Sequence, residues 1–318
     1  MKMRISHHLC MAALLALAAC KSTSDVGSRS STVADKRPAA KLVQPIERDG
    51  RYVLEFDNLR FEVAKAGGKV MTFSIDGYNM LVATHPINFG STAWASPQND
   101  WNWPPQTAID SEPYTVEVAG NTITMTSGVT TTVPKIRLIK KFTPDLVKRA
   151  IDIEYTLRNE DTVARNLAVW EVTRVAAGGL TFFPIVGTTD RPGSRMKPTL
   201  IADGYAWMDM AINPPRNPKL NADGMGYIAH TDGNRLFVKS WADVPADAQA
   251  PGEGEVEFYD GDTNMELENQ GRYGSVAPGE SITYKVRWSL VNLPTGAMRV
   301  AQDPKLIEAA QALATSAP

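Results

Sequence analysis

Residues 150–158, with the sequence AIDIEYTLR, decide the fold class of this chain. Apolar side chains alternate here with polar ones, so one face of the segment is apolar and the other carries the charges. This period of two is the pattern of a half-buried antiparallel strand. The chain continues it on both sides, in residues 52–56, 70–75, 123–125, 165–174, 236–241, 256–259 and 282–290. The sequence therefore predicts a protein built mainly from strands.

Turn-forming residues separate the expected strands, for example Gly67-Gly68 and Pro278-Gly279. Only residues 304–313 have a helical pattern, with Pro304 in the first turn and Asp303 as the N-cap. Helices do not alternate with strands, and no repeat is visible. We therefore predict an all-β fold, a large antiparallel β-sandwich of two packed sheets with a short C-terminal helix.

The N-terminus predicts an export signal. Lys2 and Arg4 precede the apolar residues 9–19, a run too short to span a bilayer. Residues 17–20, LAAC, resemble the lipobox of bacterial lipoproteins, in which the peptide before the cysteine is removed and the cysteine is acylated. The resemblance implies a signal peptide over residues 1–19 and lipidation of Cys20. An ordinary signal peptide that ends near a cysteine is the alternative.

Three segments follow from this interpretation. Residues 1–19 are the signal peptide, residues 20–46 the lipidated cysteine and a disordered tether, and residues 47–318 the folded domain. We expect a lipid-anchored protein of the bacterial cell envelope. Lys21, where inner-membrane lipoproteins of enteric bacteria have Asp, favours the outer membrane.

Charge and cysteine content exclude several functions. Removal of residues 1–19 leaves 31 basic residues of the original 33 against 35 acidic ones, a net charge of −4 that disfavours nucleic acid. Cys10 leaves with the signal, so Cys20 has no partner for a disulfide or a cysteine metal site. Motifs for phosphate, zinc or a nucleophile elbow are absent, and we expect no cofactor and no metal. Weak calcium binding by the acidic residues 252–263 stays open, although a solvated strand edge explains them more simply.

Several short motifs resemble the galactose mutarotase superfamily. They are GGKVMTF at residues 67–73, MELENQ at 265–270 and APGES at 277–281. The Trp-rich residues 91–105, STAWASPQNDWNWPP, are similar to a bacterial lipoprotein subfamily within it. The resemblance spans residues 50–292 and implies a large antiparallel sandwich, the galactose mutarotase-like supersandwich, whose concave face binds sugar.

Glu268 matches the general base of that superfamily. There, a carboxylate takes the proton of the anomeric hydroxyl while an imidazole protonates the ring oxygen. Glu266 shares the face of Glu268, and such crowding raises the pKa of one carboxyl. On spacing alone, an exposed strand residue is the better explanation of Glu268.

The expected acid is missing. No histidine stands in residues 166–174, where the superfamily has its catalytic imidazole, and Arg174 keeps its proton and therefore binds rather than donates. His85 and His230 are the histidines left after processing. His230 alternates with apolar residues as a strand histidine does, and His85, at the start of the Trp-rich segment, is the better site candidate.

The remaining signal is a sugar-binding surface. Trp94, Trp101 and Trp103 lie within one expected loop with Gln98, and indole rings stack on sugar rings while amides bind hydroxyl groups. The alternative is that the rings fill the core or fix the loop. The other tryptophans, Trp170, Trp207, Trp241 and Trp288, are predicted to be strand core.

We therefore expect a membrane-anchored, monomeric carbohydrate-binding lipoprotein. Its cleft combines Glu268, Arg174, His85 and the Trp-rich loop, the membrane is reached through Cys20, and nucleic acid is not a partner. An aldose 1-epimerase-like isomerase with Glu268 as general base is one alternative. An envelope scaffold that binds another protein is a second.

Overall fold

The structure is a computed structural model that describes residues 43–84, 89–187, 189, 191–209, 219–261 and 264–315. The predicted signal peptide, Cys20, most of the predicted tether and His85 lie outside the described residues. The described residues form one compact unit. Among the described residues, no helix has the length and apolar character needed to cross a membrane.

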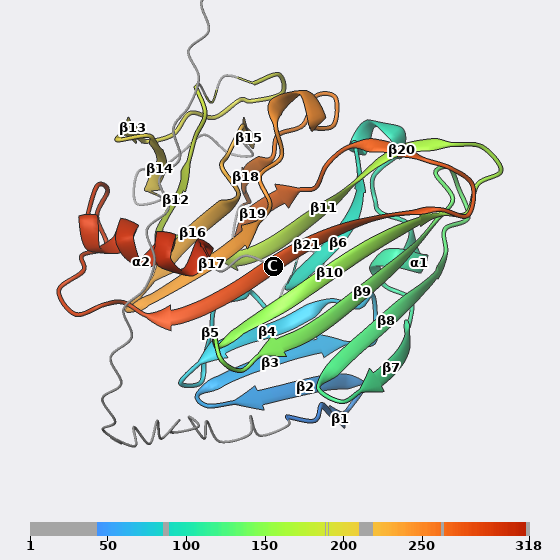
Figure 1. The fold of residues 1–318 in the computed structure, drawn as a ribbon, viewed down its shortest axis with the longest axis horizontal. Helices are drawn as coiled ribbons and strands as arrows, with labels where there is room; N and C mark the ends of the chain where they lie inside the picture. Colours follow the sequence, from blue (N-terminus) through green and yellow to red (C-terminus); the bar gives the residue numbers. More distant parts are fainter. Residues whose placement is uncertain are drawn as a thin grey trace, which may run out of the picture. The chain divides into compact units, whose positions relative to one another are not determined.

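Two antiparallel sheets make up the unit (Figure 1). The first sheet contains, in spatial order, β1 (Ile46–Arg48), β2 (Arg51–Phe56), β3 (Leu59–Ala64), β4 (Val70–Ile75), β6 (Ser91–Ser96), β11 (Arg165–Ala176), β19 (Asn264–Gln270), β18 (Val256–Asp260) and β15 (Lys219–Ala222). In addition, β5 (Tyr78–Asn79) pairs with β4, and β20 (Gly274–Val276) pairs with β11.

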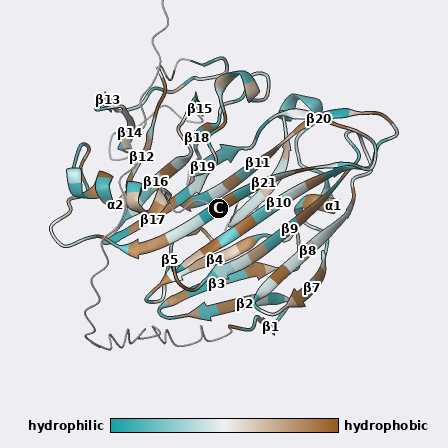
Figure 2. Cartoon of the chain, in the orientation of Figure 1, coloured by the Kyte–Doolittle hydropathy of each residue, from teal (hydrophilic) through white to brown (hydrophobic). Residues whose placement is uncertain are grey.

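The second sheet contains, in order, β13 (Leu200–Ala202), β14 (Tyr205–Asp209), β12 (Leu180–Pro184), β16 (Tyr227–Asp232), β17 (Arg235–Trp241), β21 (Ser281–Asn292), β10 (Ala150–Asn159), β9 (Ile136–Asp145), β8 (Thr122–Val129) and β7 (Thr115–Ala119). The segment that predicted the fold class is β10, which pairs with β9 and β21. Figure 2 shows its alternation of hydrophilic and hydrophobic residues. The all-β prediction is confirmed.

Apolar residues fill the space between the sheets. Phe61 and Phe73 come from the first sheet, and Phe142, Phe237 and Trp288 come from the second. The Trp288 ring lies 5.1 Å from that of Phe237 and 5.8 Å from that of Phe73. Such offset and edge-on ring pairs add to the stability that burial of their area provides.

One ion pair also crosses the interior. Glu171 of the first sheet lies 3.0 Å from Lys239 of the second, and both side chains are fully buried. The Tyr155 hydroxyl donates to Glu171 at 2.7 Å, while Lys239 Nζ donates to Thr173 Oγ1 and to the Leu267 carbonyl, each at 2.9 Å. These neighbours reduce the desolvation cost of the pair, although Glu171 Oε2 has only its ion pair with Lys239 within the described residues.

The predicted C-terminal helix is α2 (Pro304–Ala314), and Asp303 caps it by accepting a hydrogen bond from Leu306 N at 2.9 Å. The apolar side of α2 packs on the outer face of the second sheet (Figure 1). The cluster there contains Leu180, Phe182, Tyr205, Trp207, Leu236, Leu306 and Ala310. Trp207, Trp241 and Trp288 are buried, as predicted for strand core.

Three short helical turns also occur: α1 (Thr107–Asp110) and the 3₁₀ turns η1 (Gln98–Asp100) and η2 (Ala246–Ala248). Part of the expected Trp-rich loop is β6, a strand inside the first sheet. That expectation was wrong because STAWAS is buried on both faces and therefore shows no polar alternation.

Candidate functional site

The strand β11 lies between β6 and β19 in the first sheet (Figure 1). Its side chains alternate between two buried faces. Glu171 and Thr173 point inward, since both contact residues between the sheets. Trp170 and Arg174 therefore point to the opposite side. We call this side, formed by β6, β11, β19, β18 and β15, the polar outer face.

Strand register brings the predicted site residues together on this face. Trp170 lies opposite Trp94 of β6, and Arg174 lies opposite Glu266 of β19. Glu268 lies two residues further along β19, on the same side as Glu266. Residues distant in sequence thus become neighbours because three antiparallel strands align.

Glu268 lies in a cluster of charged side chains. Its Oε2 accepts a hydrogen bond from Trp170 Nε1 at 2.7 Å. Glu257 of β18 lies directly opposite in register, and Lys219 Nζ bridges the two carboxylates at 2.7 Å from Glu257 and 3.3 Å from Glu268. One lysine therefore forms ion pairs with two neighbouring carboxylates.

Burial and charge shift the pKa values of this cluster. Burial raises the pKa of Glu257 well above its ordinary range, Lys219 opposes that effect, and Glu268 adds to it. Burial alone lowers the pKa of Lys219, but the charges of Glu268 and Glu257 raise it above its ordinary value. Two neighbouring carboxylates disfavour each other's charge, and burial of Glu257 acts in the same direction.

Arg174 is committed to neighbours within the protein. Its Nε donates to Glu266 Oε1 at 2.8 Å, and its guanidinium lies 5.5 Å from the ring centre of Trp94. Burial raises the pKa of Glu266 to about 7, against the opposing effect of Arg174. Arg174 and Glu268 are each only 1% exposed, so they lie at the base of the face. That Arg174 binds a ligand stays a prediction.

Four indole rings form a cluster beside these charges. Trp94 lies 5.1 Å from Trp170, 5.6 Å from Trp103 and 6.1 Å from Trp101, measured between ring centroids. Trp94 and Trp170 are strand residues, and Trp101 and Trp103 follow η1. Trp170 is buried and belongs to the core cluster, as predicted, but its position beside Trp94 and Glu268 was not predicted. The period of two, which puts residues 170 and 174 on one side, was the available signal.

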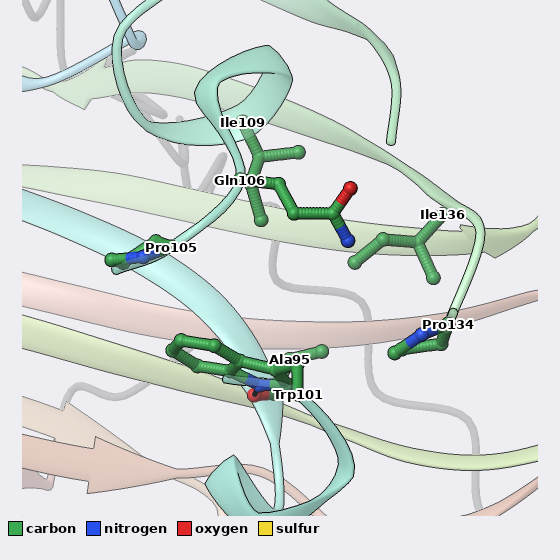
Figure 3. Close-up of a pocket in the computed structure, with 7 residues that line it drawn as sticks. All are labelled: Ala95, Trp101, Pro105, Gln106, Ile109, Pro134 and Ile136. Atoms are coloured by element: carbon green, nitrogen blue, oxygen red, sulfur yellow. Dashed lines mark hydrogen bonds between the residues drawn. The ribbon is translucent and has the colours of Figure 1, made fainter. Parts of the chain in front are cut away.

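Trp101 and Trp103 differ in what they contact. Trp101 Nε1 donates to the Ala95 carbonyl at 2.9 Å, and its ring lines a narrow slot with Ile109 and Pro134 (Figure 3). The slot, about 10 Å³, has room for one water at most. Trp101 therefore fixes its segment to the sandwich. Trp103 is 51% exposed and offers the accessible ring of the cluster.

Gln98 lies above the polar outer face at the start of η1, and its backbone N–H donates to Glu253 Oε1 at 3.1 Å. Four buried polar atoms on this face have no hydrogen-bond partner within the described part of the chain: Thr92 Oγ1, Gln270 Nε2, Asn221 Oδ1 and Glu257 Oε2, the last of which is ion-paired with Lys219. Buried polar groups in folded proteins are satisfied by protein, water or ligand. Gln270 lies opposite Trp170 in the strand register, whereas Asn221 lies on β15 at the edge of the sheet.

No imidazole lies on the polar outer face among the described residues. His230 is on β16 of the second sheet, where its Nδ1 lies 2.9 Å from Thr181 Oγ1, and burial lowers its pKa to about 4. This arrangement agrees with a strand histidine. His85 lies outside the described residues, and its site role stays a prediction.

Two of the acidic residues in the segment 252–263, Glu255 and Glu257, have different partners. Glu255 accepts hydrogen bonds from Trp241 Nε1 and Val244 N, whereas Glu257 faces Lys219. Within the described residues, no group of three or more His, Cys, Asp or Glu side chains is arranged to hold a metal ion.

Two large antiparallel sheets in this order make the chain a galactose mutarotase-like β-sandwich. A galactose mutarotase-like protein from Clostridium acetobutylicum matches it with a TM-score of 0.56 and 9% identity, over 79% of this chain and 99% of that one. A galactose mutarotase-like protein from Lactobacillus casei matches with a TM-score of 0.55 and 9% identity, over 76% of this chain and 100% of that one. A putative aldose 1-epimerase from Escherichia coli matches with a TM-score of 0.53 and 11% identity, over 76% of this chain and 99% of that one.

At these identities the similarity concerns the fold. No protein-family model matches the chain, and no curated protein matches it in sequence. The predicted resemblance to the galactose mutarotase superfamily is confirmed at the level of the fold.

Proposed function

We propose that this chain is a carbohydrate-binding protein that holds its ligand on the polar outer face of the first sheet, beside Trp103. The observation that carries the proposal is the meeting of four indole rings, buried carboxylates and unpartnered polar atoms on one sheet face. An aromatic surface beside a few fixed polar groups is what a sugar ring needs, because its C–H face is apolar and its edge carries hydroxyl groups.

The residues divide the work by their exposure. Trp103 supplies the stacking surface, since half of it is accessible. Trp94 supports Trp103 from below with its ring edge-on, at an interplanar angle of 87°. Two side chains offer polar groups to the bound sugar. They are Gln98 and Lys219, and the side chain of Lys219 is 19% exposed. Glu268 and Arg174 lie at the base of the face and hold the indoles above them, Glu268 by its hydrogen bond with Trp170 and Arg174 by its contact with the ring of Trp94.

A glycan array probed with the chain from residue 21 onward tests this proposal. We expect binding to a defined group of glycans, with affinity for the best one reduced about tenfold or more in Trp103→Ala, equivalent to at least about 1.4 kcal/mol. Trp103→Phe keeps an aromatic surface and serves as the matched control, with an intermediate affinity. Thermal unfolding should be nearly unchanged in both, because Trp103 is exposed.

Absence of binding across the array contradicts the proposal. If the same protein then retains an envelope protein in a pull-down, the scaffold alternative replaces it.

The lipid anchor is the second part of the proposal. Acylation of Cys20 would hold the domain at the membrane through residues 21–46. Labelling of cells with a clickable fatty acid should mark the wild-type protein but not Cys20→Ser, and only the wild type should sediment with the outer membrane. An unlabelled wild type contradicts the anchor and leaves the sugar site untouched.

The carboxyl pair supports one catalytic alternative, an aldose 1-epimerase-like isomerase. Glu268 would accept the proton of the anomeric hydroxyl, and Glu257, whose pKa burial raises, would in its protonated form give its proton to the ring oxygen as the bond from C1 to that oxygen breaks. Closure of the ring on the other face returns both protons. In this alternative, Glu257 takes over the role of acid that the superfamily gives to an imidazole on another strand.

Polarimetry of freshly dissolved α-aldoses separates binding from catalysis. An isomerase accelerates mutarotation, and Glu268→Gln and Glu257→Gln each slow it by at least about a hundredfold. Rates equal to the uncatalysed reaction for the wild type exclude this alternative and leave the binding proposal standing.

A further inference from the structure

We infer that a polar groove at the start of β11 is a second sugar subsite, so that the ligand is a glycan chain rather than a single sugar. The inference rests on the carbohydrate-binding function proposed above. The groove has a volume of about 280 Å³. Its lining includes Asp100, Val133, Pro134, Arg165, Asn166 and Tyr273.

The groove lies at the start of β11, at the end of the polar outer face, and Arg165 and Leu167 in its lining have the parity of the inward-pointing Glu171. Asn166 has the same parity on β11 as Trp170, so both side chains point to the same side of the sheet. Four residues of strand separate them, about 13 Å. Ala168, which lies between them on this side, is opposite Ser96 of β6. Small side chains therefore connect the groove to the indole cluster.

The turn η1 also joins the two places. Its first residue, Gln98, bonds to Glu253 beside the polar outer face, and its last residue, Asp100, lines the groove. Pro134 forms a wall shared by the groove and the Trp101 slot. The groove and the indole cluster are thus built on one short, fixed segment.

The polar groups of the groove are held in place. Arg165 Nε donates to Asp161 Oδ2 at 2.6 Å, and that oxygen also accepts from Lys135 N at 3.1 Å. This pairing leaves the Nη groups of Arg165, whose side chain is 30% exposed, as oriented donors. The half-buried Tyr273 shares a hydrogen bond with Asn166, and burial and Asp100 raise its phenol pKa.

The lining fits a neutral sugar unit. An aromatic ring, an amide, one carboxylate and one guanidinium supply stacking together with donors and acceptors, and the two opposite charges cancel. An apolar partner would leave these groups unsatisfied. A phosphate backbone would meet no excess of positive charge. The volume is at the lower end for small-ligand sites, as expected for one unit of a longer chain.

Chain-length dependence of affinity tests the inference. Cello-, malto- and chito-oligosaccharides of one to four units are titrated calorimetrically into the chain from residue 21 onward. In the series that binds, we expect the tetrasaccharide to bind about tenfold more tightly than the monosaccharide. Arg165→Ala and Tyr273→Ala should each reduce this ratio to about twofold while the monosaccharide Kd stays unchanged.

Arg60→Ala is the matched control, because Arg60 on β3 is similarly exposed and ion-paired but lies outside the groove. It should leave both Kd values unchanged. A chain-length gain that survives in both groove variants contradicts the inference alone, and so does monosaccharide binding without any gain. If no sugar of any series binds, the proposed function falls together with the inference.

Discussion

On the outer face of the second sheet, Phe182 and Trp207 stack 4.7 Å apart beneath α2. On the outer face of the first sheet, an indole instead donates to Glu268, and Lys219 bridges two carboxylates. Both faces bury their central side chains, but one buries hydrocarbon and the other buries charge. Burial of hydrocarbon stabilises a fold, whereas buried ion pairs often contribute little or nothing net. The apolar face therefore explains stability, and the polar face calls for a functional explanation.

The largest expected effect is on the apolar face. Trp207→Ala should lower the free energy of unfolding by about 3–5 kcal/mol, because a fully buried indole leaves a cavity. Trp207→Phe is the matched control, with a much smaller loss, because Trp207 Nε1 has no hydrogen-bond partner among the described residues. Urea unfolding measures both. Sugar affinity of the folded Trp207→Ala protein should equal that of the wild type, and a selective loss of affinity would join the two faces functionally.

The second effect is a pH dependence of stability that arises from Glu266 on the polar outer face. The pKa of Glu266 is raised to about 7 in the fold, so the folded chain binds a proton there that the unfolded chain has already released. Stability from this group is therefore present below about pH 4.5 and is lost as pH rises to about 7. Its size is up to about 3 kcal/mol.

Glu266→Gln should remove that contribution, since the amide oxygen still accepts from Arg174 but no longer titrates. The free energy of unfolding of the variant should rise relative to the wild type across this pH range. A difference that stays constant with pH would mean that Glu266 is ionised throughout.

The smallest effect is at the edge of the apolar face. Asp303 caps α2 through Leu306 N and also accepts from Met298 N at 3.2 Å. Asp303→Ala should cost about 1 kcal/mol of unfolding free energy, and Asp303→Asn, which still caps, should cost much less. Equal losses in thermal unfolding would assign the effect to the charge of Asp303 rather than to its hydrogen bonds.

The sequence predicted the fold because strands such as β10 keep one face partly exposed. Their alternation of apolar and charged residues follows directly from that exposure. In β11, residues 167–175 are all buried, so hydrophobicity no longer distinguishes the inner side from the outer. For this reason the sequence predicted that Trp170 is buried but not that it lies on the same side as Arg174.

Other parts of the candidate site depend on register between distant strands. Glu257 and Lys219 join Glu268 only because β18 pairs with both β19 and β15. Neither residue carries a local motif that predicts this pairing. Glu268 was found through its resemblance to a known motif, and its neighbours required the structure.

The buried pair of Glu171 and Lys239 has a consequence for assembly of the chain. Apolar side chains between two sheets distinguish alternative alignments only by how well they pack. A sandwich closed out of register would instead leave both charges buried without partners, at a cost of about 3–5 kcal/mol. The pair therefore disfavours packing of the two sheets in a wrong alignment. It also fixes the relative position of β11 and β17 before any ligand is met.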